Sequence, residues 1–278
     1  MSTELPIQAP ATPDFGPGAH SPTLPQSGFV LDFAAPPAVN ASGEETVALF
    51  AAARLPGRFA DIYGGRLEGA VQIVAVDYRT GTAYHNNAEI GHMVPLAAVM
   101  DPNPAPPQPG VAYFESTEMH FAVDLRTQLT LPPNAGLYGV FLWLDEMTSS
   151  LHEVRIPGGE PAAPAPQPPF GALNFRKSSQ TPLAKGSEVV LHNSPKDRRV
   201  YGAVGGDAKG GPLTLLALDY RSRLLKSATF PVNELAFDFD LIELLGDPGW
   251  ITSTSKPQKA FVLAVSRGFL SRVVVIEA

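Results

Sequence analysis

The chain contains no cysteine in its 278 residues, which excludes disulfides, thiolate catalysis, cysteine-ligated zinc and iron–sulfur clusters. Charged residues are few, at 17% of the chain, against roughly 25% in typical soluble domains. The N-terminus has no basic stretch followed by an apolar run, as a secretory signal requires, and no apolar stretch approaches the roughly 18 residues of a membrane-spanning helix. We therefore expect a protein of the bacterial-type cytoplasm, or one exported without a cleavable signal, and no membrane association.

Motifs for the common chemistries are also missing. None of the histidines belongs to an HExxH helix or to another close metal-ligand spacing. No serine lies in a GxSxG elbow or in a Ser-x-x-Lys motif before a helix, and the glycine-rich pieces fit turns better than strand-to-helix phosphate loops. The basic residues form neither a basic helix nor an RNP-type aromatic pattern. The sequence therefore predicts no enzyme, no cofactor, no metal and no nucleic-acid partner.

Proline, in contrast, is abundant, and 19 of its 29 copies lie in three places. Eight fall in residues 1–40, five in residues 101–110 and six in residues 157–169. Because proline supplies no backbone donor, such segments are expected to be extended or disordered. We therefore expect a disordered tail over residues 1–43, a proline-rich insertion at about 92–117 and a semi-rigid linker over 158–182.

The most informative feature of the chain is an internal repeat. Three pairs of segments match in the same order: residues 72–79 with 214–221, 121–125 with 237–241, and 151–156 with 271–276. The first pair contains the twin sequences Asp77-Tyr78-Arg79 and Asp219-Tyr220-Arg221. One β-rich unit used twice explains the three matches, and the repeated residues are then expected to serve the scaffold.

The segments between the proline-rich stretches have the patterns of β-strands. Residues 71–78 and 213–220 are short, nearly continuous apolar runs bounded by turn residues, as expected for core strands. Each repeat holds six or seven such strands in about 100–110 residues, the count of an immunoglobulin-like sandwich. We predict an all-β fold, a tandem duplication of an immunoglobulin-like β-sandwich domain, with repeats over 44–157 and 183–278. A single larger sandwich built from both halves is the alternative.

The first strands of the two repeats are harder to match, because no segment identity marks them. We pair residues 47–50 and 58–63 of the first repeat with residues 188–191 and 199–204 of the second. All four segments are rich in apolar or aromatic residues and precede the repeated Asp-Tyr-Arg strand. This pairing predicts that each repeat opens with two strands upstream of its central strand.

Charge is unevenly distributed along the chain. Residues 1–170 hold 6 Lys/Arg against 17 Asp/Glu, and residues 171–278 hold 14 against 10, so the two parts carry −11 and +4. Opposite charges attract within one molecule or between molecules. The expected positive, partner-binding surface of the second part consists of Arg198, Arg199, Arg221 and Arg223.

The predicted tail contains one apolar segment, Phe29-Val30-Leu31-Asp32-Phe33. Such a segment adds a strand to a sheet edge or engages a partner. We expect Phe29, Leu31 and Phe33 to dock on a protein partner or on another copy of this chain. The function that the sequence favours is therefore that of a non-catalytic protein-binding or assembly protein, a scaffold or structural component.

Two other functions stay open. A duplicated aspartate at a strand end could bind a cation in each half. We favour the alternative, in which the aspartate ends the strand by accepting turn amides. The tyrosine that follows it is then expected to close the core with its hydroxyl in water. The runner-up function is a divalent-cation or small-ligand binder, related to stress, that uses Asp77, Glu89, Asp219 or Asp240. An enzyme whose site is assembled between two sandwiches is the third.

One stretch of the second repeat has a family resemblance. Residues 183–191, Leu-Ala-Lys-Gly-Ser-Glu-Val-Val-Leu, with the later pair Asp240-Leu241, resemble the opening of tellurium-resistance TerD-like β-sandwich domains. The resemblance covers less than a third of the chain and implies a β-sandwich. That family carries an acidic calcium-binding strand, where this chain has the single aspartate Asp219. The calcium ligands of the family are therefore not matched.

Overall fold

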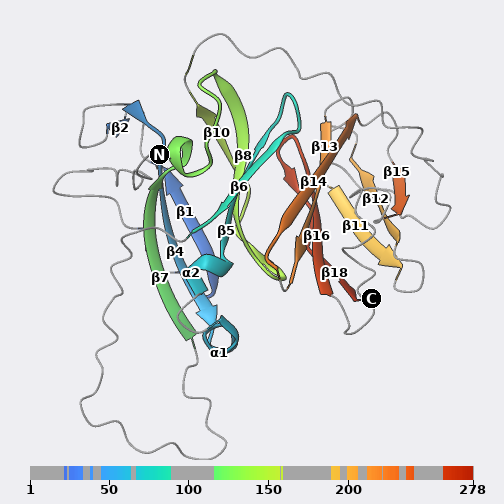
Figure 1. Cartoon of the computed structure of the whole chain (residues 1–278), viewed down its shortest axis with the longest axis horizontal. Coiled ribbons are helices and arrows are strands. Elements are labelled where there is room, and N and C mark those ends of the chain that lie inside the picture. The colour runs from blue at the N-terminus through green and yellow to red at the C-terminus, as the bar shows by residue number, and fades with distance from the viewer. Residues whose placement is uncertain are drawn as a thin grey trace, which may run out of the picture. The chain divides into compact units, whose positions relative to one another are not determined.

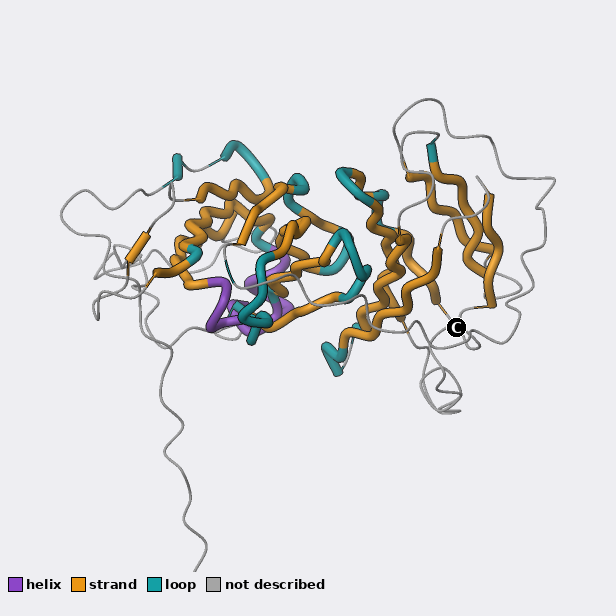
Figure 2. The backbone as a smooth tube through the Cα atoms, turned by 90° about the horizontal axis from the view of Figure 1, so that it is seen from above, coloured by secondary structure: helices purple, strands orange, loops and turns teal. Residues whose placement is uncertain are grey.

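The computed structural model describes residues 22–23, 25–33, 38–39, 45–63, 67–88, 116–156, 158, 189–194, 199–205, 212–220, 222–231, 236–240 and 259–277. Almost every one of these segments is strand or loop (Figure 2). The helices in the described ranges are short: α1 (Arg58–Tyr63), α2 (Leu67–Ala70) and α3 (Leu125–Gln128). None of them has the length and apolar character to cross a membrane. Most of the predicted tail, insertion and linker lies outside the described residues.

The second repeat forms two antiparallel sheets. The strands of the first sheet, in the order β11-β12-β15, are β11 (Val189–Ser194), β12 (Arg199–Val204) and β15 (Ala236–Asp240). The second sheet has the order β14-β13-β16-β17, with β18 also paired to β16. Its strands are β13 (Pro212–Asp219), β14 (Leu225–Pro231), β16 (Lys259–Ser266), β17 (Phe269–Leu270) and β18 (Val274–Glu277).

The first repeat has the same sheets strand for strand. Its first sheet, in the order β1-β4-β7, consists of β1 (Gly28–Phe33), β4 (Ala48–Pro56) and β7 (Ser116–Asp124). Its second sheet has the order β10-β8-β5-β6, with β9 also paired to β8. The strands are β5 (Gln72–Asp77), β6 (Ala83–Asn87), β8 (Gly136–Leu144), β9 (Met147–Thr148) and β10 (His152–Ile156). A separate pair is formed by β2 (Ala38–Val39) and β3 (Glu45–Thr46).

This strand order confirms the predicted fold class. Apart from the pair β2–β3, the first, second and fifth strands of each repeat form one sheet, and the third, fourth, sixth, seventh and eighth form the other. Short strands divided in this way between two antiparallel sheets are the architecture of immunoglobulin-like sandwiches. The chain is therefore an all-β protein that consists of a tandem duplication of an immunoglobulin-like β-sandwich.

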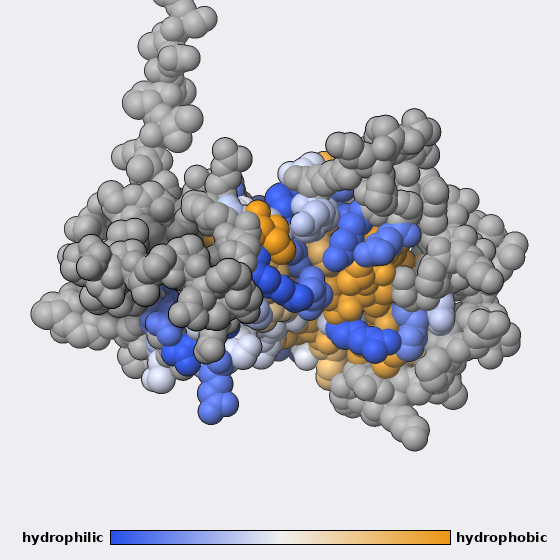
Figure 3. Space-filling model, turned by 90° about the horizontal axis from the view of Figure 1, so that it is seen from below, coloured by the Kyte–Doolittle hydropathy of each residue, from blue (hydrophilic) through white to orange (hydrophobic). Residues whose placement is uncertain are grey.

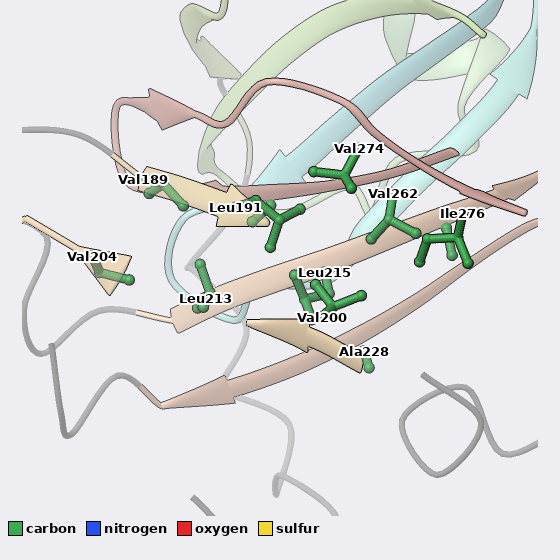
Figure 4. Packing of buried hydrophobic residues seen from close by; sticks show 12 residues of the cluster. Val189, Leu191, Val200, Val204, Leu213, Leu215, Ala228, Val262, Val274 and Ile276 are labelled. Carbon is green, nitrogen blue, oxygen red and sulfur yellow. The ribbon is translucent and has the colours of Figure 1, made fainter. Parts of the chain in front are cut away.

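The core of the second repeat is made of aliphatic side chains from both of its sheets (Figure 4). Strands β11 and β12 contribute Val189, Leu191, Val200 and Val204. Strands β13, β14, β16 and β18 contribute Leu213, Leu215, Ala217, Ala228, Val262, Ala264, Val274 and Ile276. Removing this apolar surface from water is the main stabilisation of the sandwich.

The structure corrects the predicted start of the first repeat. Arg58–Tyr63 is helix α1, in which the rings of Phe59 and Tyr63 stack 6.5 Å apart at i and i+4, a spacing that suits a helix. Residues 47–50 adjoin or lie in β4, which has the place of β12 in its sheet. The counterpart of β11 is β1, which lies inside the segment predicted as a tail and pairs with β4.

The structure also shifts the alignment of the repeat ends. The amide of Tyr78 bonds the carbonyl of Leu137, and the amide of Tyr220 bonds that of Lys259, so Leu137 and Lys259 are equivalent. Three residues further on, Val140 pairs with His152 and Val262 pairs with Val274, which makes His152 equivalent to Val274. The predicted alignment placed residues 151–156 on 271–276, which is two residues away. Because side chains alternate with a period of two, a shift of two keeps the same face buried, and the apolar pattern cannot reveal it.

The chain divides into two compact units whose boundaries do not follow the repeats. One unit holds residues 1–73 and 86–132, and the other holds residues 74–85 and 133–278. The second unit thus unites β8, β9, β10 and most of β5 and β6 from the first repeat with all of the second repeat.

Candidate functional site at the face between the repeats

The central strands of the second repeat are buried on both faces. In β13, Leu213 and Leu215 belong to the core of their own sandwich, whereas the alternate residues Leu216 and Leu218 belong to a second core. Strand β16 divides in the same way. Successive side chains of a strand point to opposite faces, so a strand buried on both faces is apolar at nearly every position. Strands β13 and β16 therefore form a middle layer, between β11 and β12 on one side and β5 and β8 on the other (Figure 1).

We call the second core the inter-repeat core, because both repeats contribute to it. Its buried members from the first repeat are Val74, Val76, Tyr78, Phe141 and Trp143, and those from the second are Leu216, Leu218, Leu225, Phe261, Leu263 and Val265. Phe141, Trp143 and Phe261 have no solvent exposure and are among the largest fully buried side chains described. Separation of the repeats would expose all three to water, which is unfavourable.

Each repeat presents the same face to the other. In the repeat alignment, Val74 and Val76 of β5 are equivalent to Leu216 and Leu218 of β13. All four residues belong to the inter-repeat core. Equivalent surfaces that face one another are the arrangement of a twofold dimer interface, here within one chain. The repeated residues therefore serve the scaffold of each sandwich and also the binding of one repeat to the other.

The twin aspartates close equivalent turns at one end of β5 and β13. The Asp77 carboxylate accepts the amide of Arg79 at 2.8 Å, and the Asp219 carboxylate accepts the amide and the hydroxyl of Ser222 at 2.6 and 2.7 Å. The prediction that each aspartate accepts turn amides is confirmed. Neither belongs to a group of three or more acidic or histidine side chains able to hold a metal, as far as the described ranges extend.

The turn of the first repeat fits closely into the second repeat at Gly81. Its carbonyl oxygen accepts hydrogen bonds from the hydroxyls of Thr214 and Thr229, both at 2.7 Å. The φ angle of Gly81 is +73°, in the left-handed region that favours glycine. A Cβ atom at this position would collide with Thr229 and lie 2.9 Å from the Cβ of Pro212. Glycine is therefore required both by the turn and by the close approach of the second repeat.

The equivalent turn of the second repeat carries an ion pair instead. Arg223 is equivalent to Gly81, because each donates its amide to the backbone carbonyl of the aspartate in its own turn. The φ of Arg223, +57°, is also left-handed. Its guanidinium lies 2.5 Å from the carboxylate of Asp145 in the turn between β8 and β9. The two side chains are 15% and 3% exposed, so the pair is shielded from the solvent that weakens surface ion pairs.

Asp145 joins the ion pair to the inter-repeat core. Its backbone carbonyl accepts the indole N–H of Trp143 at 2.6 Å, which satisfies the one polar atom of the largest side chain in that core. Its φ is +50°, which is unfavourable for a residue with a Cβ. The surrounding contacts hold this strained conformation in place, as is common at sites that serve a specific interaction.

The first repeated tyrosine is buried between the repeats. Tyr78 lies over Gly139, where a Cβ atom would collide with the tyrosine ring. Burial raises the pKa of Tyr78 above its usual value of 10, and the backbone of Gly268 in the second repeat opposes part of that shift. The prediction of a hydroxyl in water is therefore wrong for Tyr78, because the second repeat covers it.

The second repeated tyrosine has a different environment. Phe261 occupies the position of Gly139, and its ring meets the half-buried Tyr220 edge-on at 6.1 Å. The Lys259 ammonium lies 5.7 Å from the Tyr220 ring and 5.1 Å from the Phe261 ring, within cation–π range. The two faces are therefore related by the repeat but are not identical.

A pair of buried serines that sequence analysis missed repeats the same hydrogen bonds. The hydroxyl of Ser149 accepts the amide of Leu142 at 2.9 Å, and that of Ser271 accepts the amide of Ala264 at 2.9 Å. Each hydroxyl donates to the carbonyl of the residue that follows it. These serines hold the break between β9 and β10 and between β17 and β18. An alignment shifted by two residues would have revealed them.

The predicted docking segment is a strand of the first repeat. Phe29, Leu31 and Phe33 lie in β1, which is an outer strand of the described sheet, as is β7. Leu31 is buried, and the two phenylalanines are half-buried. Their binding to a partner stays a prediction, and the binding surface would be the edge of the sheet that β1 forms.

The predicted positive surface is only partly described. Arg198 and Arg221 lie outside the described residues, and Arg199 lies in β12 opposite Asp240, with its side chain outside the description. The charge of Arg223 is matched by Asp145. A partner-binding role for the four arginines stays a prediction, and for Arg223 the structure gives an internal role.

The residues of the alternative cation site are not brought together where they are described. Asp77 and Asp219 bond their own turns, Glu89 lies outside the described residues, and Asp240 is described only as part of β15. No observation in the described part of the chain therefore favours a metal site over the scaffold role.

No protein-family model and no curated protein matches the sequence. Among solved structures, the BSP domain of a biofilm-associated protein is 10% identical over 84% of this chain and 27% of that chain, with a TM-score of 0.21. The FN1–FN3 domains of chicken CNTN1 are 8% identical over 97% and 68%, with a TM-score of 0.20. Two fibronectin type-III domains of chicken tenascin are 8% identical over 90% and 97%, with a TM-score of 0.19. This chain thus spans about a quarter of the biofilm-associated structure, and its fold assignment rests on its own strand order.

Substitution of Gly81 tests the close approach of the repeats. Gly81→Ala adds the cost of a left-handed alanine, about 1 kcal/mol, and a collision with the second repeat, so we expect a loss of about 3 kcal/mol in the free energy of unfolding. Gly268→Ala is the matched control, since its φ is +76° and nothing lies within 4 Å of the added Cβ. Urea denaturation should show a loss of only about 1 kcal/mol for the control. Equal losses would contradict the fit of Gly81 between the threonines.

Removal of the ion pair tests its contribution across the repeats. Arg223→Gly relieves about 1 kcal/mol of left-handed strain but removes the partner of a buried carboxylate, which costs about 3 kcal/mol, so a net loss of about 2 kcal/mol is expected. Asp145→Asn in the same chain should recover part of that loss, and a double-mutant cycle should give a coupling of about 1–3 kcal/mol. Additive single effects in thermal or urea unfolding would show that the pair contributes nothing.

The buried hydroxyl of Tyr78 predicts a loss of stability at high pH. Because its folded pKa is raised, the unfolded chain releases the proton first, so the stability contribution is full below about pH 10 and falls as the pH rises above it. The slope from this one proton has an upper limit of about 1.4 kcal/mol per pH unit. Tyr78→Phe should flatten the fall in unfolding free energy between pH 9.5 and 11. An unchanged slope would contradict the burial of this hydroxyl.

Proposed function

We propose that this protein is a non-catalytic binding or assembly protein that engages a protein partner or further copies of itself. The observation that supports the proposal is the use of the reactive side chains. The repeated aspartates bond turns, the buried serines hold strand breaks, and the partly buried arginine pairs with Asp145 between the repeats. These groups serve the architecture and leave backbone edges and surface side chains for recognition.

The sheet edges are the surfaces best suited to this role. The inter-repeat core occupies the faces of β5, β8, β13 and β16, so these faces are closed to a partner. An outer strand, in contrast, carries backbone donors and acceptors that pair with an extended segment. Among the outer strands we favour β1, because its residues include Phe29, Leu31 and Phe33 and its single charge is Asp32. The Asp32 carboxylate accepts the amide of Phe33 at 2.8 Å.

The described surface does not favour a purely electrostatic partner. The described part of the face in Figure 3 shows hydrophobic and hydrophilic residues side by side. Of the large hydrophobic residues in the described ranges, Ile62 and Leu224 are about half exposed. An extended peptide that pairs with a strand and places alternate side chains on mixed surface suits this character better than a polyanion.

A charge placed on the edge strand tests the proposal. We expect the full-length protein to recover a stoichiometric partner from its native host, detected by mass spectrometry, or to self-associate in light scattering. Phe29→Lys should abolish that association, because a lysine on an edge strand opposes strand addition. Ile62→Lys is the matched control, since it adds the same charge at an exposed residue in helix α1, outside strand β1.

The outcomes separate three possibilities. The melting temperature of both variants must stay close to that of the parent for the comparison to hold. Loss of association with Phe29→Lys alone supports the β1 edge. Loss on deletion of residues 1–21, which precede β1, together with retention by Phe29→Lys would move the binding role to that segment. A monomer without any companion in the parent protein would refute the proposed function.

A further inference from the structure

We infer that the inter-repeat core is a docking surface through which the first repeat binds the second specifically and without need of the covalent linker. This inference is independent of the proposed function, because it concerns only contacts within the chain. The surface of the first repeat consists of residues from β5, β8 and the turns that follow them. Its ligand is the equivalent surface of the second repeat.

The composition of the surface is that of an obligate interface. Its buried members in the described ranges are aliphatic and aromatic side chains from both repeats, as in the core inside the second sandwich. Obligate interfaces resemble a domain core cut in half, whereas transient interfaces are no more apolar than the general surface. The loss of solvent exposure by Trp143, Phe141 and Phe261 places large side chains at the centre, where interfaces derive most of their affinity.

Polar contacts at the margins give the surface its register. Gly81 accepts two hydroxyl hydrogen bonds from the second repeat, and Arg223 pairs with Asp145 of the first. Each contact requires one particular residue of the other repeat, at sequence separations of 133, 148 and 78. Removal of one partner would leave a buried polar group unsatisfied, so a slipped pairing is disfavoured.

Differences in side-chain size favour pairing between unlike repeats. Trp143 corresponds to Val265, and Gly139 corresponds to Phe261, so each repeat is large where the other is small. An interface of two first faces would contain two tryptophans and two glycines at these positions, and an interface of two second faces would contain two valines and two phenylalanines. Since interiors are close-packed, neither combination conserves the volume of the native pair.

Severing the chain between the repeats tests the inference. A protease site inserted after residue 170 in the full-length protein allows cleavage after folding. We expect the two fragments to remain a one-to-one complex in native mass spectrometry and size-exclusion chromatography at micromolar concentration. Separation into two species, or into dimers of like fragments, would overturn the inference.

Two variants distinguish docking from general stability. Arg223→Ala in the severed protein should weaken the complex at least about tenfold, measured by dilution, because it removes a contact across the repeats. Arg54→Ala is the matched control, since Arg54 pairs with Glu118 at 2.7 Å on an exposed surface within the first repeat. Its severed complex should dissociate at the same concentration as the parent. Equal weakening by both variants, with both fragments still folded by circular dichroism, would refute a specific docking surface.

Discussion

The structure depends on the burial of β13 and β16 on both faces. A strand in an ordinary sandwich has one face in the core and one in water, and its sequence alternates accordingly. Here the second face meets the other repeat, so Leu216 and Leu263 are as buried as Leu215 and Val262 on the opposite side. The same constraint explains why the compact unit extends across the repeat boundary: the sheet that carries β8 has an apolar face that the second repeat covers.

The turns show how two similar units achieve one specific fit. Both turns place a left-handed residue after the repeated aspartate, Gly81 in the first repeat and Arg223 in the second. Glycine allows the backbone to approach the threonines, whereas the arginine accepts conformational strain and reaches Asp145. A symmetric pair of turns would use the same contact twice. The two different contacts make the pairing directional, which an interface of repeated apolar strands alone would not ensure.

The sequence was sufficient to predict the fold class and the central strands. The runs 71–78 and 213–220 are apolar at nearly every position, which identifies buried strands, and their repetition indicates two similar domains. The same runs do not reveal what covers the second face, because an apolar strand does not identify the segment that packs against it. The prolines around residues 28–33 favour a tail, whereas the pairing of β1 with β4 depends on tertiary contact.

The contacts of the site were beyond sequence reasoning for a related reason. A glycine after Asp77 reads as an ordinary turn residue, and only the approach of Thr229, 148 residues away, shows that a side chain is excluded there. Likewise, Asp145 is one of two adjacent acidic residues in a hairpin turn, and nothing local singles it out as the partner of Arg223. Such contacts depend on which faces meet, and the pattern of apolar residues does not encode that choice.

Closure of the central faces also determines where recognition is available. A single immunoglobulin-like sandwich offers both sheet faces and both sets of edges to partners, whereas this chain has used one face of each repeat for itself. In the described part of those sheets, recognition is left to the outer strands, whose backbone groups pair with extended segments irrespective of side-chain chemistry. In such a protein the packing of β13 against β5 is specific, and the two sheet faces that take part in it are no longer free to bind a partner. Its partners are therefore expected at the edges, where strand addition requires no rearrangement of the inter-repeat core.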